Sequence, residues 1–183
     1  MRQHPITLSA LVLLSLATAG CSKDGVSPGE VSGNVARAEL VGADQAKYGE
    51  VIVAQGDNDL IVNIKAKGMS PGPHGVHIHE TGKCEGPDFK SAGGHWNPAG
   101  KQHGFDNPQG AHAGDFFNLD IGADGTGSLE AMVSGGKLSD GDIALMDADG
   151  AAVVVHEGPD DLKTDPSGDS GGRLACGVFV RGR

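Results

Sequence analysis

Residues 60–65, Leu-Ile-Val-Asn-Ile-Lys, indicate the fold class of this chain. Leu60, Val62 and Ile64 form one apolar row, and the alternate positions carry Asn63 and Lys65. Successive side chains of a strand point to opposite faces, so a period of two is typical of a half-buried β-strand. Beyond residue 20, no segment of ten residues has a convincing helical period.

Short strand-like segments recur along the chain, at residues 35–41, 50–55, 60–67, 76–80, 116–121, 128–133, 143–146, 152–156 and 174–180. Turn signals separate them, as at residues 56–58, 123–125 and 148–150. Glycine is abundant, with 31 of 183 residues, and this composition suits a protein with many turns. We therefore expect an all-β domain, built as an antiparallel barrel or sandwich.

Two longer stretches interrupt this rhythm, at residues 81–115 and 157–173. Loops of this length are uncommon in compact domains and are usually functional when they are ordered. Each begins just after a strand that carries histidine. We expect both loops to contribute to a functional site.

The most informative triplet is His77-Ile78-His79, because two histidines separated by one residue share one face of a strand. Taken alone, the pair could equally be an exposed polar face. The long loop adds further metal-binding side chains: His95, His103, His112 and Asp115. Imidazole-rich sites suit copper, and mixed imidazole–carboxylate sites suit zinc. The pattern therefore predicts a transition-metal centre.

Three separate motifs resemble the signature of the copper/zinc superoxide dismutase family. They are residues 74–80 (His-Gly-Val-His-Ile-His-Glu), 93–98 (Gly-Gly-His-Trp-Asn-Pro) and 171–178 (Gly-Gly-Arg-Leu-Ala-Cys-Gly-Val). The resemblance extends over about residues 31–180. It implies an eight-stranded antiparallel Greek-key barrel or sandwich, with a long metal-binding loop (residues 81–115) and an electrostatic loop (residues 157–172).

The resemblance also implies the metal ligands. Copper would be held by His77, His79, His95 and His156, and zinc by His95, His103, His112 and Asp115, with His95 shared between the two metals. Asp160 matches a carboxylate that accepts hydrogen bonds from one ligand of each metal. His74 matches a structural histidine and not a ligand. Because every zinc position is filled, the chain does not resemble the family's copper-only branch.

Two further roles follow from the same resemblance. Cys84 and Cys176 match the family's disulfide, and Arg173 matches the arginine that guides the anionic substrate to copper. The electrostatic loop carries only one lysine, Lys163, so we expect steering to draw on other cations as well. We consider Lys83 and Lys90, in the metal-binding loop, as candidates.

The N-terminus predicts export. Residues 1–20 read as a signal peptide with a short apolar core, and residues 21–30 as a flexible tether before a domain at 31–183. Two cleavage sites compete: residues 17–19 (Ala-Thr-Ala) suit ordinary secretory cleavage, whereas residues 19–21 (Ala-Gly-Cys) resemble a bacterial lipoprotein signal. Cys21 remains unpaired if the other two cysteines form a disulfide, which favours lipidation. We expect a periplasmic or envelope protein, anchored through Cys21.

The net charge of −10 argues against a nucleic-acid partner. The resemblance implies dismutation of superoxide to dioxygen and hydrogen peroxide, which would protect the cell envelope. One rival function is metal storage or delivery on the same scaffold, and a second is a structural lipoprotein with a decayed site. Arg173 disfavours storage, since a store needs no anion guide. The sequence leaves open whether the chain is a monomer or a homodimer.

Overall fold

The computed structural model describes Met1 and residues 34–182. The predicted signal peptide (1–20), the tether (21–30) with Cys21, and the first residues of the predicted domain lie outside this part. Among the residues described, no helix is both long and apolar enough to cross a bilayer. The only helical element there is a single 3-10 turn, η1 (Lys90–Ala92).

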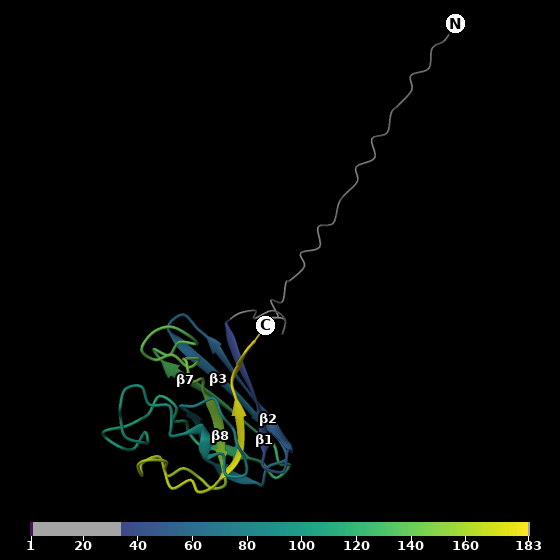
Figure 1. The fold of residues 1–183 in the computed structure, drawn as a ribbon. Coiled ribbons are helices and arrows are strands. Elements are labelled where there is room, and N and C mark those ends of the chain that lie inside the picture. Colours follow the sequence, from purple (N-terminus) through teal and green to yellow (C-terminus); the bar gives the residue numbers. More distant parts are fainter. Residues whose placement is uncertain (2–33, 183) are drawn as a thin grey trace. The chain divides into compact units, whose positions relative to one another are not determined.

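The strands form one large antiparallel sheet, which Figure 1 shows, and one small pair. They are β1 (Val35–Gly42), β2 (Lys47–Gln55), β3 (Asp59–Ala66), β4 (Gly72–His74), β5 (Val76–His79), β6 (Leu119–Ile121), β7 (Gly127–Ser134), β8 (Ala152–His156), β9 (Arg173–Val178) and β10 (Val180–Arg181). The order in the large sheet is β5-β8-β9-β1-β2-β3-β7, with β10 paired to β1, and β4 pairs with β6. Strands distant in sequence are thus neighbours, as in a Greek key. The predicted all-β antiparallel fold is confirmed.

The alternating stretch at residues 60–65 lies in β3, and its two faces differ as expected. Leu60, Val62 and Ile64 are fully buried, whereas Ile61 is 41% exposed. The inward residues of β1 and β2 join them in one apolar cluster. Burial of this shared inner face is the main force that holds the sheet together.

Strand β8 is buried on both faces, because the metal-binding loop covers its outer side. Val153 and Val155 belong to the main core. Ala152 and Val154 face a second cluster that contains Phe89 and Ala92 of that loop together with Cys176. This double burial explains why residues 152–155 are continuously apolar and do not alternate.

The prediction of a strand at residues 143–146 is wrong. The segment is irregular and makes one isolated bridge, between Ala144 and Lys137. Leu145 is buried in the main core, with Ile143 partly buried against it. The apolar residues of this loop pack against the core. A short apolar run in the sequence does not distinguish such a loop from a buried strand. The sequence analysis also did not predict β4, a three-residue strand that pairs with β6. Two of its residues are Gly72 and Pro73, which are uncommon in strands.

Candidate metal centre

Three of the histidines share one face of two neighbouring strands. Val76 and Ile78 of β5 belong to the main core, which leaves His77 and His79 on the opposite face, both fully buried. β8 is antiparallel to β5, and His156 at its end bonds through its backbone N–H to Gly75 O at 2.8 Å. The register of two strands therefore brings three imidazoles together.

The metal-binding loop is fastened to β5 by the backbone of one residue, Ile78. Its N–H donates to Gly114 O at 2.9 Å, and its carbonyl accepts from Trp96 N at 2.8 Å. These bonds place the neighbouring residues His95 and Asp115 beside the histidine face. Gly114 is required for this approach, because a Cβ at this position would collide with Ile78 O.

Four buried imidazole nitrogens converge without a hydrogen-bond partner in the described part of the chain. They are His77 Nδ1, His79 Nε2, His95 Nε2 and His156 Nε2. Their four residues form a group whose ligand atoms all lie within 4.8 Å of one another. Buried polar atoms are almost always paired, so four orphaned nitrogens at one point indicate a missing ligand. All-imidazole coordination suits copper, and this is the predicted copper set.

The opposite nitrogens of these rings are held by protein oxygens. His77 Nε2 lies 2.6 Å from Asp160 Oδ2, His79 Nδ1 lies 3.0 Å from Gly93 O, and His156 Nδ1 lies 3.3 Å from Gly171 O. Each contact orients its ring and assigns the remaining nitrogen to the cluster.

A second group surrounds Asp115. Its Oδ1 lies 2.8 Å from His95 Nδ1, 3.1 Å from His103 Nδ1 and 3.2 Å from His112 Nδ1. The Nδ1 atoms of His95 and His112 are 3.3 Å apart. Ligands about 2.0–2.1 Å from a tetrahedral zinc ion would lie about 3.3 Å from one another. These four distances, 2.8–3.3 Å, are close to the edge length of a zinc tetrahedron.

His103 Nδ1 supports a metal in this second group. It lies close to Asp115 Oδ1 and yet has no partner with hydrogen-bond geometry. Two atoms placed side by side in this way fit a shared metal better than a hydrogen bond.

A different grouping by distance would put His77 in place of His112. His77 has only Nδ1 available, since Nε2 contacts Asp160, and Nδ1 is one of the four nitrogens of the first cluster. His112 Nδ1 already faces both Asp115 and His95. The chemistry therefore favours His112 in the mixed site. His95 contributes a nitrogen to each cluster, as expected for a shared ligand.

Asp160 connects the two clusters. One carboxylate oxygen contacts His77 Nε2 at 2.6 Å, and the other contacts His103 Nε2 at 3.0 Å. A Cβ at position 168 would collide with Asp160, so Gly168, whose φ is +67°, is needed to pack there. His74 belongs to neither cluster: its ring nitrogens bond His156 O at 2.8 Å and Ser70 O at 2.9 Å.

The imidazoles of the first cluster are neutral at neutral pH. Burial lowers the pKa of His95 to about 4 and that of His156 to about 3, and it lowers the pKa of His79 well below its ordinary value. Neutral imidazoles are the form that binds metals.

His103 behaves differently. Burial lowers its pKa, but the adjacent carboxylates of Asp115 and Asp160 outweigh burial and raise it to about 9. Burial likewise raises the pKa of both carboxyl groups, but their histidine partners hold each well below the usual value. The metal-free second cluster therefore holds a proton where a cation would bind.

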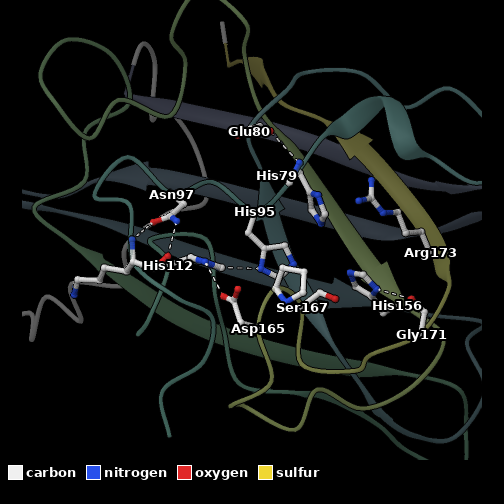
Figure 2. Close-up of a pocket in the computed structure, with 13 residues that line it drawn as sticks. His79, Glu80, His95, Asn97, His112, His156, Asp165, Ser167, Gly171 and Arg173 are labelled. Atoms are coloured by element: carbon white, nitrogen blue, oxygen red, sulfur yellow. Dashed lines mark hydrogen bonds and ion pairs between the residues drawn. The ribbon is translucent and has the colours of Figure 1, made fainter. Parts of the chain in front are cut away.

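These clusters open onto a pocket of about 570 Å³. Figure 2 shows the rings of His79, His95 and His156 turned toward a common space, with Arg173 beside it. Two carbonyls of the metal-binding loop fix the guanidinium: Nη1 donates to Phe89 O at 2.7 Å, and Nη2 donates to Gly93 O at 2.8 Å. A partly buried cation held beside four neutral imidazoles creates a site for a small anion.

Comparison with known proteins agrees with this geometry. The profile of the copper/zinc superoxide dismutase family matches residues 47–179. The chain belongs to the copper/zinc superoxide dismutase family. Membership confirms the predicted enzyme class, superoxide dismutase, and its cofactors, copper and zinc.

Several members of the family are similar over most of their length. A "Superoxide dismutase [Cu-Zn] 2" from Aquifex aeolicus is 40% identical over 146 residues, which cover 79% of this chain and 85% of the relative. A "Superoxide dismutase [Cu-Zn]" from Caulobacter vibrioides is 41% identical over 147 residues, covering 79% and 84%. A crystal structure of a superoxide dismutase-like protein from Bacillus subtilis superposes with a TM-score of 0.75 at 39% identity, covering 79% of this chain and 97% of that one.

The predicted disulfide of this family member is confirmed. Cys84 and Cys176 are bonded, with their Cα atoms 5.7 Å apart. The bond joins the metal-binding loop to β9, which also carries Arg173. It therefore holds the carbonyls that orient the guanidinium close to the strand from which Arg173 projects.

Some residues of the dismutase pocket were missed at the sequence level. Lys101 and Asp165 line it, whereas neither Lys83 nor Lys90 does. Lys90 Nζ instead pairs with Asp88 at 3.0 Å. The position of Lys101 depends on Asn97, whose side chain forms hydrogen bonds with both the N–H and the carbonyl of Lys101. No motif in the sequence indicates this pair of hydrogen bonds.

Proposed function

We propose that this chain dismutates superoxide in the bacterial cell envelope, with copper bound by His77, His79, His95 and His156 and zinc bound by His95, His103, His112 and Asp115. The observation that carries the proposal is the convergence of four orphaned imidazole nitrogens in a pocket that also holds a fixed guanidinium. A metal store would need the imidazoles but not the guanidinium.

Bound copper supplies the one-electron chemistry that converts one superoxide to dioxygen and a second, with two protons, to hydrogen peroxide, whereas zinc has no redox chemistry. The protein's own contribution is to bind the anion, orient it and supply protons. Each of these tasks falls to a different group of the pocket.

Arg173 binds and orients the anion. Two of its nitrogens are already hydrogen-bonded to backbone carbonyls, which fixes the plane of the guanidinium, and its remaining N–H groups can face the pocket. Burial lowers the pKa of Arg173, but a guanidinium stays charged at any working pH. The fixed charge compensates locally for the net charge of −10, which would otherwise repel superoxide.

His95 is placed to hold and release a proton. Its ring lines the pocket, Nδ1 faces Asp115 at 2.8 Å, and Nε2 has no partner in the described chain. Because Nε2 is also a proposed copper nitrogen, it could carry a proton only while it does not hold copper, and such a proton would face the pocket. The proposed zinc set, to which His95 Nδ1 and Asp115 belong, would support this exchange because it holds the ring from the other side.

Export and anchoring complete the proposal. The predicted signal peptide and Cys21 support an envelope location, where the enzyme would remove superoxide outside the cytoplasm. The measurement is the intact mass of the protein from membrane fractions, with Cys21→Ser as the variant. A lipid-sized mass increase that C21S abolishes would support anchoring, and an unmodified chain beginning after Ala19 would refute it.

The catalytic part is tested with purified, copper- and zinc-loaded protein. Arg173→Ala should lower kcat/KM for superoxide by roughly 10-fold or more. Arg181→Ala, which removes the same charge from the exposed strand β10, is the matched control and should change little. Equal rates for wild type and R173A would contradict the assigned role of Arg173.

A further inference from the structure

Asp165 contacts two residues of the zinc set without belonging to it. Its Oδ1 accepts the backbone N–H of His103 at 2.7 Å, and the same oxygen lies 4.0 Å from His112 Nε2. Figure 2 shows the carboxylate of Asp165, a residue of the electrostatic loop, directed toward the ring of His112. The two histidines are nine positions apart in the metal-binding loop, so one carboxylate bonds the backbone of the first and lies near the ring of the second.

His103 is consequently held at two places by the electrostatic loop. Asp160 Oδ1 contacts its Nε2 at 3.0 Å, and Asp165 Oδ1 contacts its backbone at 2.7 Å. The first contact sets the direction of the ring, and the second sets the position of the backbone from which the ring projects. Together they determine where Nδ1 lies relative to Asp115.

The loops also meet through their backbones near these contacts. Asp106 N donates to Leu162 O at 2.9 Å. Gly104, with φ of +95°, permits this approach, because a Cβ there would collide with Leu162 O. The electrostatic loop is therefore docked against the segment that presents His103.

We propose that Asp165 is a positioning residue for the zinc site and that it couples zinc binding to the electrostatic loop. This inference rests on the proposed zinc ligands. Partners of metal ligands outside the coordination shell typically contribute about 10- to 100-fold to metal affinity. Coupling is reciprocal, so zinc must stabilise the docked electrostatic loop as much as that loop stabilises zinc.

The test measures zinc affinity of the full-length, copper-free protein by competition with a colorimetric chelator. Asp165→Ala, which removes the acceptor, should weaken zinc binding roughly 10-fold or more. Asp165→Asn keeps an acceptor oxygen and should restore most of that affinity. Asp169→Asn removes one charge from the same loop, at a residue with φ of +49° that Asn tolerates, and should bind zinc like wild type.

A second measurement is hydrogen exchange of residues 157–172 with and without zinc. Zinc should protect this loop in wild type and in D165N, and much less in D165A. If D165A does not fold, Asp165→Glu replaces it, since the longer side chain keeps the charge and displaces the acceptor; its zinc affinity should also fall.

Two results would overturn the inference, and they differ from failure of the proposed function. Zinc affinity of D165A or D165E equal to wild type would refute the role of Asp165 alone. Equal losses in D165A and D165N would also refute it, because the acceptor would then not matter. A wild-type chain that binds no zinc would refute the ligand assignment itself, and this inference with it.

Discussion

His156 on β8 and Arg173 on β9 occupy directly paired positions of two adjacent antiparallel strands. A bulge between Val155 and His156 interrupts the regular register just before this pair. Bulges re-aim side chains, and they are common next to active sites. Here the pairing places the imidazole proposed to bind copper and the guanidinium proposed to bind superoxide in the same pocket. The sheet itself thus aligns the proposed copper site with the proposed substrate guide.

Asp160→Ala should weaken both metal sites, because Asp160 contacts one residue of each proposed ligand set, His77 and His103. We expect zinc and copper affinities to fall by about 10- to 100-fold, measured by chelator competition. Asp120→Asn, an exposed carboxylate of β6, is the control and should leave both affinities unchanged. Affinities of D160A equal to those of wild type would contradict the bridging role.

Removal of the disulfide should affect both stability and catalysis. The double variant Cys84→Ala/Cys176→Ala should lower the free energy of unfolding by about 2–5 kcal/mol, measured by urea denaturation. Its kcat/KM should also fall, since Phe89 O and Gly93 O, which orient Arg173, lie in the loop that the bond secures. An unfolding midpoint identical to that of wild type would show that packing alone holds the loop.

Stability of the metal-free protein should be highest near the ordinary histidine pKa of about 6.5. Below that pH, the unfolded chain protonates His95 and His156 while the folded chain keeps them neutral down to about pH 4 and 3, so stability falls with acidification. Above it, His103 stays protonated in the folded chain up to about pH 9, so stability falls as the pH rises.

The slope of each branch is at most about 1.4 kcal/mol per pH unit for one group. The slopes are measured by urea unfolding at a series of pH values that spans the pKa values of His95 and His103. Zinc displaces the proton of His103, so the alkaline branch should vanish in zinc-loaded protein. A metal-free stability that rises steadily over the whole range would contradict the assigned protonation of His103.

Lys101→Gln should slow substrate capture more than Lys90→Gln. Lys101 lines the pocket, whereas Lys90 is paired with Asp88. We expect kcat/KM of K101Q to fall roughly two- to ten-fold at low salt, with the difference shrinking as salt screens the charge. Stopped-flow rates at several ionic strengths provide the measurement. If K90Q had the larger effect, steering would come from the other side of the pocket.

The sequence predicted most strands because their burial differs between the two faces. The alternation in residues 60–65 corresponds to one buried and one partly exposed face of β3. The strand predicted at residues 143–146 was wrong because Leu145 is buried although it lies in an irregular loop. A buried apolar run without a regular period does not show whether the segment is a strand or a loop.

The candidate site could be predicted where its residues are close together in the sequence or belong to a family motif. His77 and His79 share a face because of strand geometry alone, and the remaining proposed ligands, with Arg173, followed from the family resemblance. Asp165 and Lys101 escaped because their roles depend on how two distant loops dock. The carbonyls of Gly93 and Gly171 orient His79 and His156. They could not be predicted, because every residue has a carbonyl and the sequence does not show which ones face a histidine.

The central claim is that the four converging imidazoles form a redox-active copper site. Its most direct test is superoxide decay by stopped-flow, with zinc-loaded wild-type protein titrated with copper. The account predicts that the rate rises linearly and levels off at one copper per chain. At that point kcat/KM should approach about 10⁸–10⁹ M⁻¹s⁻¹, the diffusional ceiling that superoxide dismutases are known to reach. Tight binding of one copper per chain without superoxide turnover would contradict the claim.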